Sequence, residues 1–99
     1  MSKFGELISA QVPVLIDFYT DWNESSVAMH EVIRDVAAAL GDKAKVIKID
    51  VEKNQELAEA LRIKGVPTLM VYKDGQMVWR KSGELDANSL ITIVQELLV

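Results

Sequence analysis

Short apolar runs and amphipathic segments alternate along the 99-residue chain. Nearly continuous runs rich in β-branched and aromatic residues are typical of buried strands, whereas apolar residues spaced three and four apart are typical of helices packed on a core. The apolar runs predict strands at 12–19, 46–51, 68–72 and 77–81. The helical spacing predicts helices at 3–10, from the polar stretch 20–26 to a stop at Gly41, at 55–62, and around Leu90, Ile93, Val94 and Leu97.

Turn and capping residues separate these segments. Asn54 precedes the third helix and Asp86 or Asn88 the fourth, where we expect their side chains to accept hydrogen bonds from the first helical N–H groups. The Asp-Gly pair within 73–76 predicts a type I′ turn between the last two strands. The order of elements predicts an α/β fold, in which a parallel pair and an antiparallel hairpin form a mixed sheet with helices on both faces.

Length and composition fit one globular domain over residues 1–99, because half of so short a chain could not bury an adequate core. Hydrophobic residues make up 49% and charged residues 26%, and no apolar run reaches the roughly 18 residues that a membrane span needs. The segment 1–11 does not resemble a secretory signal, so we expect a cytoplasmic protein. Eleven basic and fifteen acidic residues give a net charge of −4, which argues against binding to nucleic acid or to an anionic membrane.

The chain contains no cysteine and one histidine, His30. Without cysteine, these 99 residues can form no disulfide, no thiolate metal site and no cysteine nucleophile. A single histidine leaves little material for a zinc site or a Ser/His/Asp triad. We therefore expect no metal and no cofactor, and we expect His30 to be a solvated or half-buried helix residue.

Other polar and aromatic residues are expected to have structural roles. The charged pairs Glu52/Lys53 and Arg80/Lys81 are expected to be solvated. Trp79 is expected to cover a sheet edge, with Met77 and Lys81 on the same side of the strand.

Several motifs in register make the chain similar to the thioredoxin family. The segment 17–22, Asp-Phe-Tyr-Thr-Asp-Trp, is similar to the family's strand that leads into its active-site tryptophan, and Val66-Pro67-Thr68 resembles the family's cis-proline loop. Three further positions also match: Lys48, the Lys-Asp-Gly turn at 73–75, and Gly83. The resemblance covers nearly the whole chain. It implies a thioredoxin-like fold with a mixed four-stranded sheet, without the family's usual first strand.

The departure from the family lies at its catalytic cysteines. Where thioredoxins carry Cys-Gly-Pro-Cys, this chain has Asn23-Glu24-Ser25-Ser26, so Asn23 replaces the attacking thiol and Ser26 the resolving one. Neither an amide nor a serine hydroxyl can exchange with a disulfide, so these residues cannot carry out dithiol exchange. Asn, Glu and Ser are favourable at a helix start, which accounts for the substitutions structurally. A new catalytic role is the alternative.

Asp17 and Lys48 match a proton-relay pair of the family. A carboxyl within the apolar strand 12–19 should be desolvated, which raises its pKa unless it finds partners. With Ser26 in place of the thiol, Asp17 has no such proton to accept. One interpretation is a relic whose charge is partly compensated by Lys48 and whose oxygen bonds Ser26, and the other is a proton-linked switch.

The positions that match the family's peptide-binding surface need no sulfur. In thioredoxins the backbone of the residue before the cis-proline pairs with an extended peptide beside the tryptophan. The resemblance implies a corresponding surface here at Trp22, Glu24, Ser25, Val51, Gly65, Val66, Pro67 and Gly83. The alternative is that Pro67 serves only the turn and that Trp22 only packs.

These features favour a redox-inactive, thioredoxin-like module that binds a protein or peptide. Two alternatives stay open. One is a thiol-disulfide oxidoreductase of cell redox homeostasis (a thioredoxin) whose cysteines have been replaced, and the other is a domain that binds glutathione or another small thiol through Ser25 or Ser26 at the helix start. Monomer and weak dimer are both open, because a sheet without its first strand would have a free edge.

Overall fold

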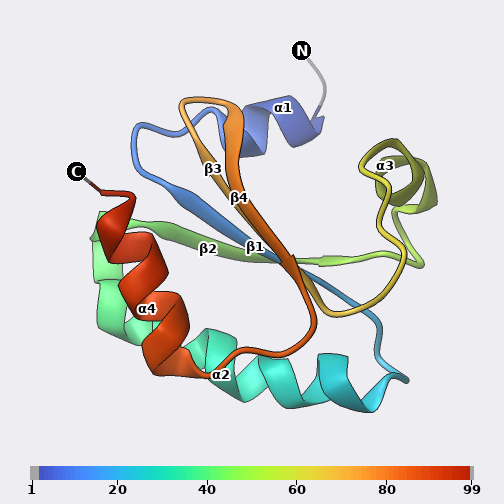
Figure 1. Cartoon of the computed structure of the whole chain (residues 1–99). Helices are drawn as coiled ribbons and strands as arrows, with labels where there is room; N and C mark the ends of the chain where they lie inside the picture. Colours follow the sequence, from blue (N-terminus) through green and yellow to red (C-terminus); the bar gives the residue numbers. More distant parts are fainter. Residues whose placement is uncertain (1–2, 99) are drawn as a thin grey trace.

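The computed structural model describes residues 3–98, so Met1, Ser2 and Val99 lie outside the described residues. The elements follow the predicted order (Figure 1). They are α1 (Lys3–Ile8), β1 (Val14–Tyr19), α2 (Glu24–Leu40), the short 3-10 helix η1 (Gly41–Lys43), β2 (Lys45–Asp50), α3 (Gln55–Ala60), β3 (Thr68–Lys73), β4 (Gln76–Ser82) and α4 (Ala87–Glu96). The predicted ends differ most at α1 and α3, which both end two residues early, and at β1, which begins two residues late.

The four strands form one sheet in the order β2-β1-β3-β4. β1 and β2 run parallel, while β3 and β4 form the predicted antiparallel hairpin. β1 also pairs with β3 in antiparallel fashion, across the centre of the sheet. The sheet is therefore mixed, as predicted, and the C-terminal ends of β1 and β2 lie beside the N-terminal end of β3.

Helices cover both faces of the sheet, as predicted (Figure 1). α2 and α4 pack over Leu15 and Leu69 on one face, and α1 and α3 lie over Ile16 and Phe18 on the other. Successive residues of a strand point to opposite faces. Asp17 therefore shares the face of Leu15 and points toward α2, where it is fully buried.

The hairpin between β3 and β4 turns at Asp74 and Gly75. Their φ values of 54° and 78° are the pair of positive angles that a type I′ turn requires, which confirms the predicted turn.

A bulge in the hairpin changes the face on which one residue lies. Trp79 pairs with Val71, but Met77 pairs with Tyr72, and the register shifts between Val71 and Tyr72. Met77 and Trp79 therefore lie on opposite faces, and the expectation that they share a side was wrong, because a bulge reverses the alternation. Trp79 is half-buried against the core beneath α2 and α4.

Two of the predicted helix caps have different outcomes. Asp86 caps α4 by accepting a hydrogen bond from the N–H of Ser89 at 3.1 Å, as expected. Asn54 makes no side-chain cap on α3. Its side-chain nitrogen donates to the backbone oxygen of Asp50 at 2.8 Å, so the amide is turned back toward the end of β2.

Arg80 holds the chain that follows α3. Its guanidinium donates to the backbone oxygens of Leu61 at 2.6 Å and of Arg62 at 2.8 Å. Arg62 has a φ of 56°, which ends the helical conformation there. The expectation that Arg80 is merely solvated was wrong, because these two carbonyls lack helical partners and Arg80 supplies the donors.

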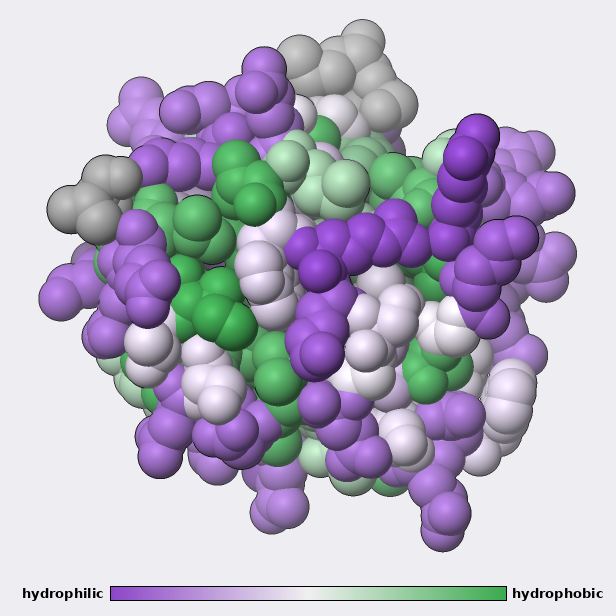
Figure 2. Space-filling model, viewed as in Figure 1, coloured by the Kyte–Doolittle hydropathy of each residue, from purple (hydrophilic) through white to green (hydrophobic). Residues whose placement is uncertain are grey.

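In the view of Figure 2, hydrophilic residues lie around most of the edge of the molecule, and smaller hydrophobic areas lie between them. Within residues 3–98, no helix is both long enough and apolar enough to cross a membrane. Five large apolar side chains of the described residues are exposed, and Trp22, at 68%, is exposed the most. Trp22 lies in the loop between β1 and α2.

Candidate functional site

The loop that carries Trp22 lies where β1 ends and α2 begins. Asn23 is the N-cap of α2, and its side-chain oxygen accepts a hydrogen bond from the N–H of Ser26 at 3.0 Å. The Val27 N–H bonds to the backbone oxygen of Asn23 at 2.9 Å. The expected structural role of Asn23 at the helix start is therefore present, and it satisfies donors that a helix start otherwise leaves unpaired.

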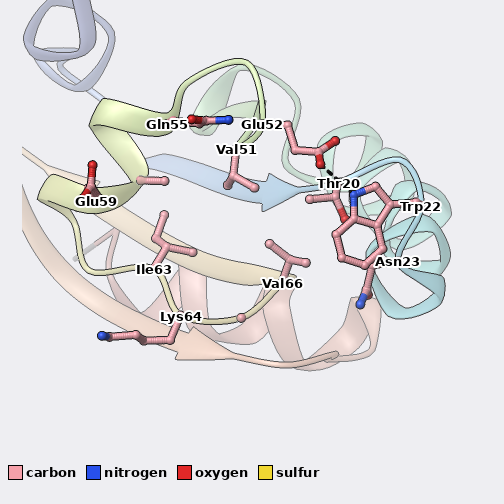
Figure 3. A pocket seen from close by; sticks show the side chains of 12 residues that line it. Thr20, Trp22, Asn23, Val51, Glu52, Gln55, Glu59, Ile63, Lys64 and Val66 are labelled. Atoms are coloured by element: carbon pink, nitrogen blue, oxygen red, sulfur yellow. Dashed lines mark hydrogen bonds between the residues drawn. The ribbon is translucent and has the colours of Figure 1, made fainter.

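A groove of about 770 Å³ opens beside this helix start (Figure 3). It lies between the loop 20–23, the segment from the end of β2 through α3, and the segment 63–66 that precedes β3. Its lining residues are Thr20, Trp22, Asn23, Val51, Glu52, Gln55, Ala58, Glu59, Ile63, Lys64, Gly65 and Val66. The groove thus brings together three chain segments that are far apart in sequence.

Four residues of the expected peptide-binding surface line this groove: Trp22, Val51, Gly65 and Val66. Glu24 and Ser25 instead line a second hollow of about 570 Å³ on α2, which also includes Trp22. Trp22 therefore contributes to both hollows.

Pro67 and Gly83, also expected at this surface, do not line the groove. Pro67 is buried and follows Val66 through a cis peptide bond. The Gly83 N–H donates to the Pro67 carbonyl at 2.8 Å, and the Thr68 hydroxyl donates to the Gly65 carbonyl at 2.5 Å. These bonds fix the path of the loop on both sides of Val66.

The backbone of Val66 is left without partners by this arrangement. Neither its N–H nor its carbonyl has a hydrogen-bond partner within residues 3–98. The residue is half-buried, and its side chain lies at the groove (Figure 3). Unpaired backbone groups at the end of a sheet are a template for an added extended chain.

Trp22 is positioned by a contact that sequence reasoning missed. Its Nε1–H donates to Oε2 of Glu52 at 2.9 Å (Figure 3). Glu52 is exposed, as expected, and it also accepts this hydrogen bond, which was not expected. The two residues are 30 positions apart, and no local pattern in the sequence links them.

Asp17 is fully buried beneath the helix start. Neither of its carboxyl oxygens has a hydrogen-bond partner among the described residues, and the same holds for the hydroxyls of Ser26 and Thr20. The expected bond between Asp17 and Ser26 is therefore absent. Burial raises the pKa of Asp17 from 3.8 to about 6, while the charge of Lys48 acts in the opposite direction.

Lys48 makes its close contacts on the outer side of this region. Its Nζ lies 3.4 Å from Nδ1 of His30 and 5.8 Å from the centre of the Tyr19 ring. The His30 and Tyr19 rings meet edge to face, 5.0 Å apart. Lys48 therefore acts on Asp17 through its field rather than through a direct bond. His30 is half-buried on its helix, as expected.

The chemistry open to this site is restricted. No group of three or more His, Asp or Glu residues that could hold a metal occurs in the part of the chain that the structure describes. Ser26 is fully buried, so of the two serines only Ser25 has exposed surface. The 99 residues hold no thiol. What the groove does present is an apolar floor, an exposed indole and unpaired backbone groups.

Comparison with known proteins identifies the family. The thioredoxin family model matches residues 1–96. A chloroplastic thioredoxin Y of Oryza sativa subsp. japonica is 38% identical over 98 residues, which is 98% of this chain and 58% of that protein. A thioredoxin of Rhodospirillum rubrum is 32% identical over 90 residues, covering 91% of this chain and 86% of the relative.

Solved structures agree with the sequence matches. A point mutant of thioredoxin from Halobacterium salinarum NRC-1 superimposes with a TM-score of 0.88 at 32% identity, over 100% of this chain and 86% of that one. The chain spans little more than half the length of the chloroplastic relatives it matches. With the thioredoxin-like fold present over residues 3–98 and the cysteines absent, the chain belongs to the thioredoxin family and lacks the Cys-x-x-Cys motif.

Proposed function

We propose that this chain is a redox-inactive thioredoxin-like module, and that it binds an extended segment of a protein or peptide in the groove beside Trp22. The observation that carries the proposal is the unpaired backbone of Val66 at the groove wall. An extended segment can pair with these groups as a short added strand, and such pairing needs no thiol. The loss of both cysteines therefore removes exchange chemistry but leaves this mode of binding.

Two further features support binding at this place. Trp22 exposes 68% of its surface at one end of the groove, and exposed tryptophans are frequent anchors of protein contacts. Thr20 lines the groove and has a buried hydroxyl with no partner among residues 3–98. A bound chain or an ordered water would supply the missing hydrogen bond.

The alternative of a small-thiol site finds less support in the geometry. Ser25 shares its hollow with the carboxylates of Glu24 and Glu84, and these would repel an anionic thiol such as glutathione. The other alternative is an oxidoreductase whose cysteines have been replaced. It would be decided by codons 23 and 26 of the source gene, because the present chain has no cysteine.

The proposal can be tested with cysteine-free linear octapeptides selected against the chain from a displayed library. The amide signals of Val66 and the indole signal of Trp22 should shift when such a peptide is titrated into the 15N-labelled chain. N-methylation of the peptide residue whose N–H pairs with the Val66 carbonyl should then weaken binding by about tenfold. The methyl group removes the donor and leaves the Val66 carbonyl buried without a partner.

Methylation at the neighbouring peptide residue is the matched control, because its N–H points away from the groove in an extended chain. If methylation at either position weakens binding equally, or if the Val66 amide signal does not shift on titration, strand-like pairing is contradicted. Changing the peptide rather than the protein keeps the fold of the chain out of the comparison.

A further inference from the structure

The charges around the groove are mainly negative. Glu52 and Glu59 line it together with one cation, Lys64, and all three side chains are exposed. Glu52 lies beside Trp22, Glu59 lies on α3, and the Lys64 side chain extends away from Trp22 (Figure 3). The end of the groove near Trp22 therefore presents the carboxylate of Glu52, while Lys64, the one lysine that lines the groove, extends away from it.

The second hollow next to Trp22 extends this negative region. It is lined by Glu24 and Glu84 and by no basic residue. Within residues 3–98, neither of these side chains nor Glu52 or Glu59 forms an ion pair. Glu52 has one oxygen engaged by the neutral indole N–H of Trp22, which leaves its charge uncompensated.

The floor of the groove is apolar. Val51, Ala58, Ile63 and Val66 line it and are all half-buried. An apolar side chain of a bound segment would cover these atoms and remove them from water. In an extended chain, the residue two positions away points to the same face. If that residue is lysine or arginine, its stem also covers the floor while its charge reaches the rim.

Trp22 adds a second reason for a cation at this end. Its exposed ring lies between the hollows that hold Glu52 and Glu24. Lysine and arginine groups are attracted both to carboxylates and to the face of an indole ring. An acidic side chain at this end would be repelled by the same carboxylates.

Building on the proposed function, we propose that the groove selects extended segments in which an apolar residue and a lysine or arginine stand two positions apart. The apolar residue contacts the floor beside Val66, and the basic residue contacts Glu52 or Glu59. The occupant is thus a basic, apolar stretch of a partner protein.

The experiment compares three cysteine-free octapeptides that differ only at the second of these positions, which is Lys, Gln or Glu. Affinity is measured by isothermal titration calorimetry at 20 and 300 mM NaCl. At low salt the Lys peptide should bind about tenfold more tightly than the Glu peptide, with Gln between them. At high salt the ratio should fall to about twofold, because exposed charges are screened.

Two protein variants locate the effect. Glu52→Gln/Glu59→Gln should bind all three peptides with similar affinity, and Gln at position 52 keeps an oxygen for the Trp22 N–H. The control Glu56→Gln/Glu96→Gln makes the same change in net charge, on residues that do not line the groove. It should keep most of the preference for Lys.

The outcomes separate the two proposals. If the Gln peptide binds and shifts the Val66 signals, but Lys and Glu make no difference, the charge preference is wrong and the binding groove stands. If no peptide shifts the Val66 signals, the proposed function itself fails. A preference for Lys that survives in Glu52→Gln/Glu59→Gln contradicts the assignment to these two residues.

Discussion

At the scale of single residues, Asp17 makes the chain's stability depend on pH. Its carboxyl is fully buried and has no hydrogen-bond partner among the described residues. Burial raises its pKa to about 6, from 3.8. Between these two values the folded state binds more protons than the unfolded state, so the free energy of unfolding falls as the pH rises.

The first prediction concerns Asp17→Asn. A raised pKa costs the folded chain about 3 kcal/mol above pH 6, and this cost is absent below pH 4. We expect the variant to be more stable than the parent chain by about 1 to 3 kcal/mol at pH 8, because part of the gain is offset by a buried amide. Urea denaturation at pH 4, 6 and 8 measures the difference, which should shrink toward pH 4.

Asp35→Asn is the matched control, since Asp35 lies on the exposed side of α2. It should shift stability by less than about 0.5 kcal/mol at each pH. If the free energy of unfolding depends on pH in the same way in Asp17→Asn and in the parent chain, the Asp17 carboxyl is not the group that causes the pH dependence.

At the scale of elements, the conformation of the segment after α3 depends on hydrogen bonds from the β3–β4 hairpin. α3 has six residues, and Arg80 from β4 donates to the carbonyls of the two residues that follow it, Leu61 and Arg62. The Ile63 N–H donates to the Ala58 carbonyl at 2.9 Å. Because Ile63 lines the groove, the hairpin indirectly sets the shape of the groove floor.

The second prediction concerns Arg80→Lys. One ammonium group cannot reproduce the two donors that the guanidinium directs at neighbouring carbonyls. We expect a loss of about 1 to 2 kcal/mol in the free energy of unfolding, together with faster hydrogen exchange at the Arg62 and Ile63 amides. Lys81→Met, at an exposed position, is the control. Unchanged exchange at both amides in Arg80→Lys would rule out the anchoring role.

Local patterns explain why most elements could be predicted. Each strand and helix shows its own period in the sequence, and the Asp74-Gly75 turn needs only two residues to specify it. The bulge opposite Tyr72 could not be predicted, because it depends on how two strands pair. The bonds of Trp22 with Glu52 and of Arg80 with Leu61 were missed for the same reason: they join residues that only the fold brings together.

At the scale of the whole molecule, the features beside the lost cysteines are still in place. Position 23 caps α2, position 26 lies three residues later in the first turn, and Asp17 is buried close beneath. The Asn23 side chain already reaches the backbone nitrogen of residue 26 at 3.0 Å. Two thiols at these positions would therefore be near each other and near the positive end of the helix, which lowers the pKa of a cysteine thiol.

The third prediction concerns Asn23→Cys/Ser26→Cys. We expect the reduced variant to reduce an aromatic disulfide: the thiolate at position 23 attacks one sulfur, and the thiol at position 26 resolves the mixed disulfide, which releases two aromatic thiols. Mass spectrometry should find the protein lighter by two hydrogens. Asn23→Cys alone should stop at the mixed disulfide, because it has no resolving thiol. If the double variant also stops there, this chain has lost the geometry of exchange together with the sulfur. If it completes the exchange, the residues at positions 23 and 26 alone separate this chain from one that can exchange disulfides.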